Sequence, residues 1–337
     1  MTIESEHAAW RRERGVIDMH THIGIDHLDE AVRYMDQNGI ATMADISANH
    51  GKRFAEKMAA FEEYPGRFAL FSGFDFDGFG EDGWIESQLD WMDEAVDAGA
   101  IGFKIHKRFG MVYTDENDEI IRVDDERMDP IFEKAAELDT VIAFHIADPK
   151  EFFVGLDEMD ERWVEKGWWW GDREAHPYQW WDLIRQLERV ISRHQDTTFL
   201  GVHFGCASEE VGYVADVMRE NPNYIIDVSA RLPWIGAHRA DLVHDVFLDL
   251  QDRILFGTDL GVRETKMLGV PQGFAVEDHH VEEFYDAHWR YFETDEAGIV
   301  DPTPWVHGEP IDAIDLPRDV LEKFYVTNAE RYLGLKV

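Results

Sequence analysis

GVIDMHTH (residues 15–22) is the first of eight short runs rich in apolar, β-branched and aromatic residues, and these runs decide the fold. The other seven are IATMADIS (40–47), RFALFSGFD (67–75), AIGFKIH (100–106), TVIAFHIAD (140–148), TFLGVHFG (198–205), NYIIDVS (223–229) and RILFGTD (253–259). Each run is followed by a loop and a segment with helical periodicity. Near-continuous apolar strands that alternate with helices indicate a parallel sheet covered on both faces. Eight such units predict a closed (β/α)8 TIM barrel, with a doubly wound open sheet as the alternative.

The segments between these runs carry the spacing of amphipathic helices. In residues 84–99 apolar side chains recur at intervals of three and four residues, and Gly99 stands where a helix commonly ends. Further helices are expected at 27–38, 52–64, 126–139, 177–194, 208–220, 239–250 and 318–333. The chain has no internal repeat and no linker rich in proline, glycine or serine. The sequence therefore predicts a single barrel domain over residues 1–337.

Three long loops are expected after strand ends, and they indicate where a site lies. They are residues 107–125 after the fourth strand, 148–176 after the fifth and 261–316 after the eighth. In a barrel, the loops that follow strand C-termini build the active-site face. We therefore expect the functional side chains at this face.

The chain is strongly acidic, since 70 Asp and Glu residues against 32 Lys and Arg residues give a formal net charge of −38. Such a field repels phosphate backbones and anionic lipid head groups, so nucleic acid and membrane surfaces are not expected as partners. The acids are dispersed along the chain, a pattern typical of salt-adapted proteins, in which salt screens the repulsion between carboxylates. We expect a halophilic protein.

No segment of the sequence indicates export or membrane insertion. The N-terminal stretch MTIESEHAAWRRERG (1–15) has no apolar segment, and the apolar stretches are far shorter than the roughly 20 residues that cross a bilayer. Cys206 is the single cysteine, which excludes an internal disulfide. We expect a soluble, cytoplasmic protein.

Histidines and one aspartate stand at the ends of the expected strands. His20 and His22 are two residues apart on the first strand, so their side chains point the same way. His145, His203 and Asp259 end the fifth, sixth and eighth strands. The first pair alone could be buried and hydrogen-bonded, but the five together form an imidazole and carboxylate set that suits zinc and related divalent ions. These residues predict a metal centre at the barrel mouth.

The strand-end motifs resemble the amidohydrolase superfamily, in the amidohydrolase-related branch that includes the aminocarboxymuconate-semialdehyde decarboxylase type. The resemblance is carried by DMHTH (18–22), FHIAD (144–148), GVHFG (201–205), IDVSAR (226–231), LFGTD (255–259), HWRYFETD (288–295) and TNAERYLGL (327–335). It implies that His20, His22, His145 and Asp259 bind a divalent ion, Zn²⁺ or Mn²⁺. It also implies that Asp259 takes part in proton transfer, and that His203 is the second catalytic group.

Lys104, in the fourth strand, leaves the number of metal ions open. Binuclear members of the superfamily carry a carboxylated, metal-bridging lysine at this place, and with that bridge His145 and His203 would bind a second ion. In the other interpretation, Lys104 is an ammonium that anchors an anionic substrate group or pairs with Asp259. We expect one ion, with two as the alternative.

Other residues near the strand ends are candidates with ordinary alternatives. Arg231 could bind a substrate carboxylate or pair with a neighbouring acid, and Lys107 could do the same or pair with the acidic loop at 115–126. Asp18 could orient a ligand imidazole or make a plain hydrogen bond at a strand end. An aromatic cluster could cover a ligand or serve packing, and it comprises Trp168, Trp169, Trp170, Tyr178, Trp180 and Trp181.

These expectations describe a metal-dependent enzyme with a small-molecule substrate. We expect hydrolysis of a small organic acid, amide, ester or lactone. The alternative is non-oxidative decarboxylation of a small carboxylic acid, because one ligand set serves either reaction. A non-catalytic metal-binding barrel is the alternative from another class, but it gives no reason for His203 and Asp259 beside three other ligands. A homo-oligomer is compatible with the sequence.

Overall fold

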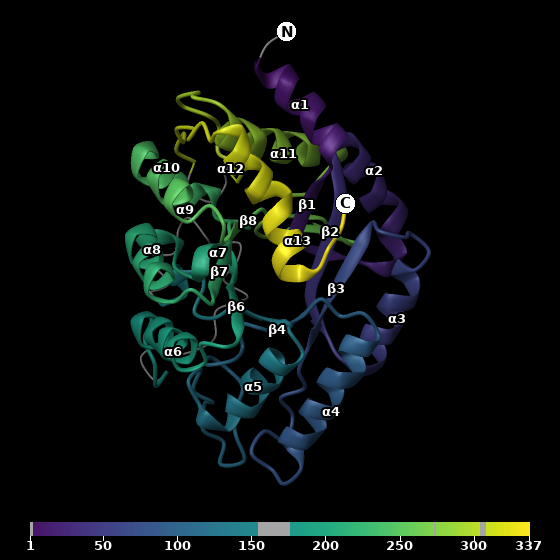
Figure 1. The fold of residues 1–337 in the computed structure, drawn as a ribbon, viewed down its shortest axis with the longest axis vertical. Coiled ribbons are helices and arrows are strands. Elements are labelled where there is room, and N and C mark those ends of the chain that lie inside the picture. Colours follow the sequence, from purple (N-terminus) through teal and green to yellow (C-terminus); the bar gives the residue numbers. More distant parts are fainter. Residues whose placement is uncertain (1–2, 154–175, 273, 304–307) are drawn as a thin grey trace.

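The structure is a computed structural model that describes residues 3–153, 176–272, 274–303 and 308–337, and its centre is a curled sheet inside a layer of helices (Figure 1). The strands are β1 (Val16–Ile23), β2 (Ile40–Asn49), β3 (Phe68–Gly73), β4 (Gly102–Ile105), β5 (Val141–Phe144), β6 (Thr198–Gly201), β7 (Tyr224–Asp227), β8 (Ile254–Leu255), β9 (Leu260–Val262) and β10 (Met267–Leu268). They are ordered β10-β9-β1-β2-β3-β4-β5-β6-β7-β8. Strands β1 to β8 coincide with the eight expected runs.

The eighth strand closes this sheet into a barrel. Its first part, β8, pairs in parallel with β7, and its second part, β9, pairs in parallel with β1. Between them, the Met19 amide donates to the Phe256 carbonyl at 3.0 Å, and the Asp259 amide donates to the His20 carbonyl at 2.8 Å. The first and last strands are thus hydrogen-bonded to each other. This closure confirms the (β/α)8 barrel and excludes the doubly wound open sheet.

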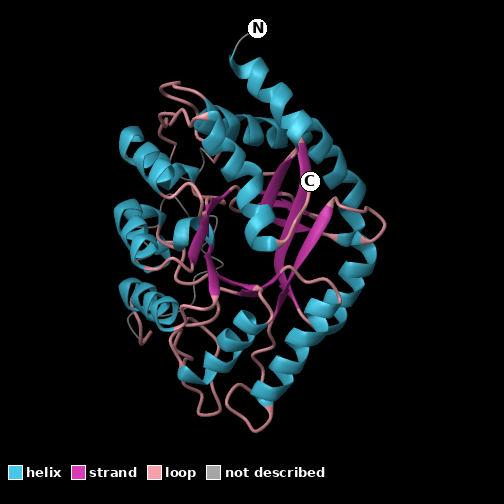
Figure 2. Cartoon of the chain, viewed as in Figure 1, coloured by secondary structure: helices cyan, strands magenta, loops and turns pink. Residues whose placement is uncertain are grey.

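Helices cover the outer face of the barrel, as Figure 2 shows. All eight expected segments form helices: α2 (Leu28–Asn38), α3 (Gly51–Phe61), α4 (Trp84–Asp97), α5 (Asp129–Glu137), α6 (Trp180–Arg193), α8 (Val211–Glu220), α10 (Ala240–Asp249), and α12 (Arg318–Glu322) with α13 (Asn328–Leu333). A π-helical turn at Lys323–Thr327 joins the last two. Among the described residues, four further helices were not predicted by the sequence patterns: α1 (Ile3–Arg14), α7 (Val202–Gly205), α9 (Leu232–Gly236) and α11 (Asp278–Glu293).

Helix α11 shows that the prediction of one long loop over 261–316 is wrong. Val281, Phe284 and Tyr285 recur with helical spacing and are buried. Arg11 of α1 lies 4.4 Å above the ring of Trp289 in α11. The connection after the eighth strand therefore contains a helix that packs into the apolar core and against α1.

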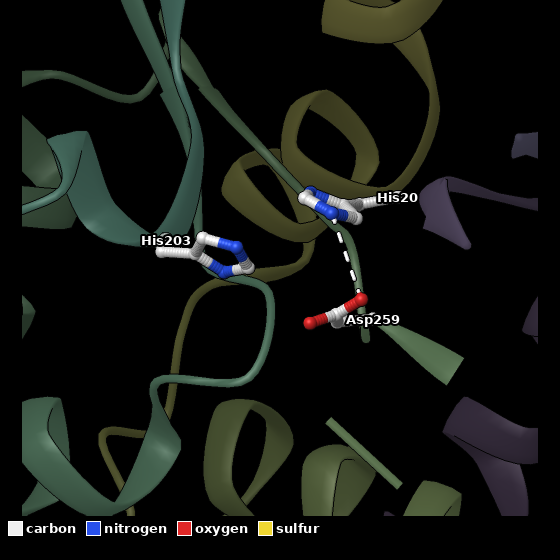
Figure 3. Close-up of side chains that lie close together, drawn as sticks. All are labelled: His20, His203 and Asp259. Atoms are coloured by element: carbon white, nitrogen blue, oxygen red, sulfur yellow. Dashed lines mark ion pairs between the residues drawn. The ribbon is translucent and has the colours of Figure 1, made fainter. Parts of the chain in front are cut away.

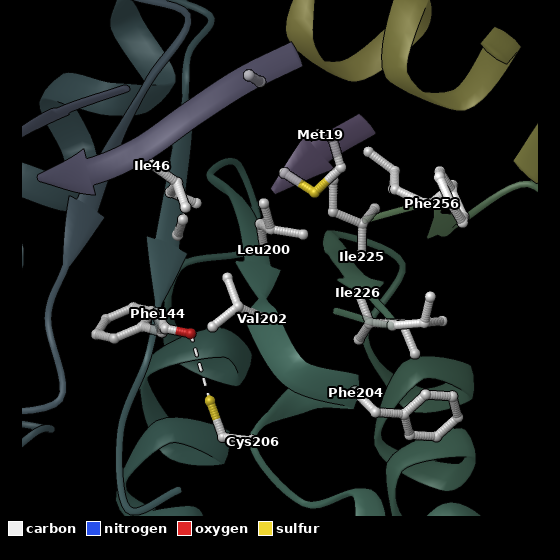
Figure 4. Close-up of a cluster of buried hydrophobic side chains, with 14 of the residues drawn as sticks. Met19, Ile46, Phe144, Leu200, Val202, Phe204, Cys206, Ile225, Ile226 and Phe256 are labelled. Carbon is white, nitrogen blue, oxygen red and sulfur yellow. Dashed lines mark hydrogen bonds between the residues drawn. The ribbon is translucent and has the colours of Figure 1, made fainter. Parts of the chain in front are cut away.

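Apolar side chains from several strands fill the centre of the barrel (Figure 4). Met19, Leu200 and Ile225 are fully buried there, whereas Phe256 packs between the barrel and the outer helices, against Trp289 and Phe324. The thiol of Cys206 is buried as well and donates to the Phe144 carbonyl at 3.3 Å, which indicates a packing role for this cysteine. None of the described helices combines the length and apolar character needed to cross a membrane.

Candidate metal centre

The five predicted site residues meet at the C-terminal ends of the strands. His20 and His22 lie on β1, His145 directly follows β5, His203 lies in α7 after β6, and Asp259 separates β8 from β9. Figure 3 shows His20, His203 and Asp259 facing one another from three different segments of the chain. Their candidate ligand atoms all lie within 4.8 Å of one another, and the three residues are buried.

His22 and His145 each contact one member of this trio. Nε2 of His22 lies 3.1 Å from Oδ1 of Asp259, and Nε2 of His20 lies 3.6 Å from the same oxygen. Nδ1 of His145 lies 3.2 Å from Nε2 of His203. A second group of possible ligands, His145 with Asp148 and His203, overlaps the first. The division of these residues between one ion, a second ion and catalysis stays a prediction.

Asp227 and Ser229, at the end of β7, hold two of the imidazoles. Oδ2 of Asp227 accepts a hydrogen bond from Nδ1 of His20 at 2.8 Å. The Ser229 carbonyl accepts one from Nδ1 of His203 at 2.9 Å. Both rings are therefore held through Nδ1, which leaves Nε2 for the centre. Sequence reasoning missed both residues, and their place in the IDVSAR motif was the available signal.

A second hydrogen-bonded group surrounds His22. Its Nδ1 lies 2.9 Å from Oγ of Ser47 on β2. The buried Asp45 accepts from the amides of Ser47 at 3.0 Å and Ile23 at 2.6 Å, and it pairs with Lys57 at 2.7 Å. Burial raises the pKa of Asp45, but Lys57 and His22 outweigh this effect, so the net pKa is lowered and the carboxylate stays charged. This network fixes the ends of β1 and β2 around His22.

Asp18 does not reach an imidazole ring. Its carboxylate accepts hydrogen bonds from the Thr258 hydroxyl at 2.6 Å and the Tyr285 hydroxyl at 2.7 Å. Burial raises the pKa of Asp18 to about 6, although these hydrogen bonds favour the charged form. Of its two predicted roles, the structure shows the plain hydrogen bond at a strand end.

Arg231 is paired with a neighbouring acid, Asp148. The guanidinium contacts both carboxylate oxygens, with Nε 3.0 Å from Oδ1, and both residues are buried. The carbonyl oxygen of Asp148 also lies 3.2 Å from Nε2 of His145. Arg231 nevertheless lines the cavity at the site. The acid pair therefore orients the guanidinium, and substrate binding by Arg231 stays a prediction.

Burial keeps the imidazoles of His145 and His203 neutral. It lowers the pKa of His145 and His203 well below the ordinary value, with help from Lys107 at His145 and from His145 and Arg231 at His203. Asp259 behaves in the opposite way. Burial opposes its charge, but His22, His20 and Arg231 outweigh that effect and lower its pKa. His145 and His203 are thus neutral imidazoles and Asp259 is a carboxylate, the forms that bind metal ions.

The hydrogen-bond pattern of the cluster fits a divalent cation. A neutral imidazole has one N–H, so when Nδ1 of His20 donates to Asp227, Nε2 carries a lone pair. That nitrogen faces Oδ1 of Asp259, a buried oxygen with no hydrogen-bond partner among the described residues. Two such lone pairs, on Nε2 of His20 and Oδ1 of Asp259, repel each other and destabilise the fold unless a cation lies between them. Imidazole and carboxylate donors suit zinc and manganese.

Lys104, on β4, lies near this cluster with its ammonium buried. Nζ has no hydrogen-bond partner among the described residues, and the residue is 3% exposed. Burial lowers its pKa to about 8, although Asp227 and Asp259 favour the charged form. A lysine that can lose its proton is suited to carboxylation, and a buried ammonium without a partner is suited to an anionic substrate group. Both predicted roles of Lys104 remain open.

The cluster opens into a cavity of about 250 Å³. Four cationic side chains line it, Lys104, Lys107, Arg231 and Arg263, together with the carboxylate of Asp259. The chain has a net charge of −38, so the positive charge of this lining is opposite to the charge of the protein as a whole. A small cavity of this kind attracts anions.

Two titratable residues of the cavity lining escaped the sequence reasoning, His106 and Arg263. His106 follows β4, and burial, with Lys107 and Lys104, lowers its pKa to about 3. Nε of Arg263 lies 3.4 Å from the His22 carbonyl. The place of His106 at the end of the fourth expected run was the available signal for it, whereas Arg263 follows β9, a strand that the sequence did not predict.

The backbone is strained where the strands end. His203, Asp259, Ala147 and Ala230 have φ values of 55°, 63°, 53° and 57°, in the left-handed region that favours glycine. Such conformations are costly and collect at functional sites, where surrounding contacts hold them. The position of these strained residues at the strand ends agrees with a functional site there.

The aromatic cluster after the fifth strand lies partly outside the described residues, because Trp168, Trp169 and Trp170 fall in the undescribed segment. Trp181 packs edge-on against Tyr213 with ring centroids 5.1 Å apart. Trp180 is buried and absent from the lining of the cavity. In the described part, these side chains therefore pack around α6.

Comparisons with known proteins identify the family and agree with the fold. Residues 17–335 match a protein family described as amidohydrolase. No curated protein matches the chain. Several solved structures share its fold at low sequence identity, and one is described as a TIM-barrel protein.

Three of these structures illustrate the likeness. A 2,6-dihydroxybenzoate decarboxylase from Rhizobium is 16% identical with a TM-score of 0.55, and the match covers 96% of this chain and 99% of the other. A dihydroxybenzoic acid decarboxylase from Polaromonas sp. JS666, with bound manganese and 2-nitroresorcinol, is 15% identical with a TM-score of 0.57, covering 96% and 97%. A 5-carboxyvanillate decarboxylase from Novosphingobium aromaticivorans, with bound manganese, is 15% identical with a TM-score of 0.53, covering 96% and 98%.

Proposed function

Because the chain belongs to the amidohydrolase family, and is therefore an enzyme, we propose that it is a metal-dependent carboxy-lyase that releases CO2 from a small carboxylic acid. The sequence patterns favour hydrolysis and keep decarboxylation as the alternative. The comparisons support the alternative better, because the similar barrels described above are decarboxylases.

The observation that carries the proposal is the cationic lining of the cavity. Lys104, Lys107, Arg231 and Arg263 surround a space of about 250 Å³. A substrate that is a carboxylate before reaction needs such a lining, whereas a neutral amide or lactone does not. The volume is below the roughly 300 Å³ at which drug-sized sites begin, so the substrate is about the size of one substituted ring.

We propose that His20, His22, His145 and Asp259 hold one divalent ion. Zn²⁺ and Mn²⁺ both suit this donor set, and manganese is present in two of the similar structures. When bound, the ion supplies a Lewis acid that polarises a substrate oxygen. The division of roles between this ion and His203 follows the family resemblance.

The reaction constrains the substrate further. Breaking the bond to the carboxylate leaves an electron pair on the substrate carbon, and a proton must reach that carbon before or as CO2 departs. A ring hydroxyl beside the carboxylate makes this carbon basic enough to be protonated. We therefore propose a hydroxylated aromatic or similarly unsaturated acid, the class described for the similar decarboxylases.

The residues of the chain can move the proton. The Asp259 carboxylate, charged at neutral pH, accepts the proton of the substrate hydroxyl and returns it to the ring carbon. CO2 then leaves, its bonding electrons restore the aromatic phenolate, and a solvent proton neutralises that oxygen. Lys104 and the Asp148-oriented Arg231 bind the departing carboxylate. The neutral His203 stabilises charge on the substrate or relays the proton.

A substrate screen tests the proposal. The purified chain, loaded with Mn²⁺ or Zn²⁺, is incubated with hydroxybenzoates and, separately, with lactones, esters and amides of similar size. We expect CO2 and the ring-protonated product from a hydroxybenzoate, measured by coupled CO2 detection and mass spectrometry. Hydrolysis products without CO2 would establish the hydrolase instead. Tight metal binding without turnover of either group would support the non-catalytic barrel.

A further inference from the structure

We infer that Asp227 is a positioning residue that sets the tautomers of His20 and His203, so that both rings present an unprotonated Nε2 to the cluster. The inference rests on the proposed metal function, because an unprotonated nitrogen is what a metal ion needs. Asp227 lies at the end of β7, which pairs with β6 and β8 and carries none of the proposed ligands. Its carboxylate is fully buried.

The first observation is that one carboxylate contacts both histidines. Oδ2 of Asp227 lies 2.8 Å from Nδ1 of His20, and an ionised carboxylate can only accept there, so Nδ1 carries the proton. Oδ1 accepts from the amide of His203 at 2.9 Å. Asp227 therefore fixes the ring of one histidine and the backbone of the other.

The single hydroxyl proton of Ser229 completes the assignment. Oγ of Ser229 lies 2.6 Å from Oδ1 of Asp227, an acceptor, so the hydroxyl proton is donated to Asp227. The same Oγ lies 2.9 Å from Nδ1 of His20 and 3.1 Å from Nδ1 of His203, and toward these atoms it can only accept. Both rings thus meet acceptors at Nδ1. The only tautomer that satisfies them has its proton on Nδ1 and a free Nε2.

The backbone at His203 is a further reason for this role. His203 and Phe204 have φ values of 55° and 56°, a left-handed conformation that is costly for such residues. The hydrogen bond from the His203 amide to Asp227 holds this turn. This backbone conformation also places Nδ1 of His203 at 2.9 Å from the carbonyl oxygen of Ser229. Position and tautomer of His203 therefore depend on one carboxylate.

Asp18 provides a matched control in the same barrel. It is fully buried like Asp227, and it accepts from Thr258 and Tyr285 without contacting an imidazole ring. Asp18→Asn therefore replaces another fully buried carboxylate of the same barrel by an amide. It leaves the acceptors at Nδ1 of His20 and His203 in place.

The test compares Asp227→Asn with Asp18→Asn in the full-length, metal-free chain. An asparagine at 227 can turn its NH2 group toward Nδ1 of His20, which favours the opposite tautomer. Imidazole ¹⁵N chemical shifts report the tautomer directly. We expect His20 to shift its proton to Nε2 in Asp227→Asn and to keep it on Nδ1 in Asp18→Asn.

Metal affinity gives the second readout, measured by titration with Mn²⁺ or Zn²⁺ alone. We expect affinity to fall 10- to 100-fold in Asp227→Asn, the usual effect of losing the partner of a ligand imidazole, and to change little in Asp18→Asn. Ser229→Ala keeps the carboxylate and should weaken binding less, and it serves as the test if Asp227→Asn does not fold. Unchanged tautomers and unchanged affinity in these variants would overturn the inference. Tight metal binding by a chain that shows no decarboxylation would overturn only the proposed function.

Discussion

Nε2 of His203 lies 3.2 Å from Nδ1 of His145, so the fifth and sixth strands present two ring nitrogens to each other. Each ring is engaged at its other nitrogen, His203 by the Ser229 carbonyl and His145 by the Asp148 carbonyl. Because burial keeps both rings neutral, each has one proton, and both outer contacts are acceptors that require it. Two lone pairs then face each other, and a bound cation relieves their repulsion.

Replacement of His20 by alanine should therefore remove the metal and the activity together while the barrel stays folded. In the proposed metal centre, His20 contributes a ligand nitrogen rather than core packing between helices. Metal content by mass spectrometry should fall from about one ion per chain to a small fraction of that, with an unchanged circular dichroism spectrum. His279→Ala, which changes an exposed histidine of α11, is the matched control. Full activity in metal-free wild-type protein would contradict this account.

Replacement of Lys104 by methionine separates its two predicted roles. With one ion and a free ammonium, metal content should stay the same while KM rises about tenfold or more, because a buried charge-assisted contact to the substrate is lost. A carboxylated bridge predicts a different result: two ions in the wild type and the loss of one in the variant. Metal analysis and steady-state kinetics on the same preparations distinguish the two.

Lys104 also predicts a dependence of stability on pH. Its folded pKa of about 8 lies below the ordinary value of 10.5, so burial of the charged form destabilises the fold below pH 8. This destabilisation decreases as pH rises from about 8 to about 10.5, because over this interval Lys104 loses its proton in the folded chain but keeps it in the unfolded chain. The shift corresponds to about 3 kcal/mol. We therefore expect metal-free wild type to gain about that much free energy of unfolding relative to Lys104→Met between pH 7 and 10.5.

The control for this measurement is Lys52→Met, since Lys52 is exposed on α3. It should show no such change relative to the wild type over the same interval. Denaturant unfolding at each pH gives the free energies. A difference between wild type and Lys104→Met that is constant with pH would show that Lys104 holds its proton equally in the folded and unfolded chains, and would contradict the lowered pKa.

The sequence could predict the barrel and the meeting of five side chains because both depend on local signals. Apolar runs identify strands one at a time, and parallel strands in a barrel bring their C-terminal ends together whatever lies between them. Histidines at strand ends, such as His20 and His145, could thus be assigned to the C-terminal face of the barrel. Their hydrogen-bond partners could not be predicted from the sequence.

Pairings between distant segments explain what the sequence left open. His20 and Asp227 are 207 residues apart, and Arg231 and Asp148 are 83 residues apart. No local pattern distinguishes Asp18 from Asp227 as the partner of an imidazole, because both are buried acids at strand positions. The choice depends on which strand neighbours which ring in the closed barrel. The same holds for Arg231, whose acid partner follows a different strand.

The net charge of −38 predicts stability that depends on screening. At low ionic strength the dispersed carboxylates repel one another, and this repulsion is larger in the compact chain than in the unfolded chain. The melting temperature should rise as KCl increases from low to molar concentration, measured by scanning fluorimetry. Sucrose at matched osmolality stabilises by exclusion alone and serves as the control. A melting temperature insensitive to KCl would contradict the halophilic interpretation.

His203 is predicted to act on the substrate rather than to hold the single ion, because His20, His22, His145 and Asp259 provide a complete ligand set in the family resemblance. Its Nε2 remains an acceptor at the cluster, and its ring is fixed from the other side by Ser229. His203→Asn should therefore keep metal content near that of the wild type while kcat falls by about two or more orders of magnitude.

The two other outcomes of that experiment lead to different sites. Loss of metal in His203→Asn would make His203 a ligand, as its place beside His20 and Asp259 within 4.8 Å also allows, and would favour the two-ion arrangement shared with His145. Retention of both metal and full turnover would leave His203 as a packing residue held by Ser229. In that case Asp259 would be left to move the proton and stabilise charge without a partner, and Lys104, whose buried ammonium has no hydrogen-bond partner among the described residues, would become the next group to test.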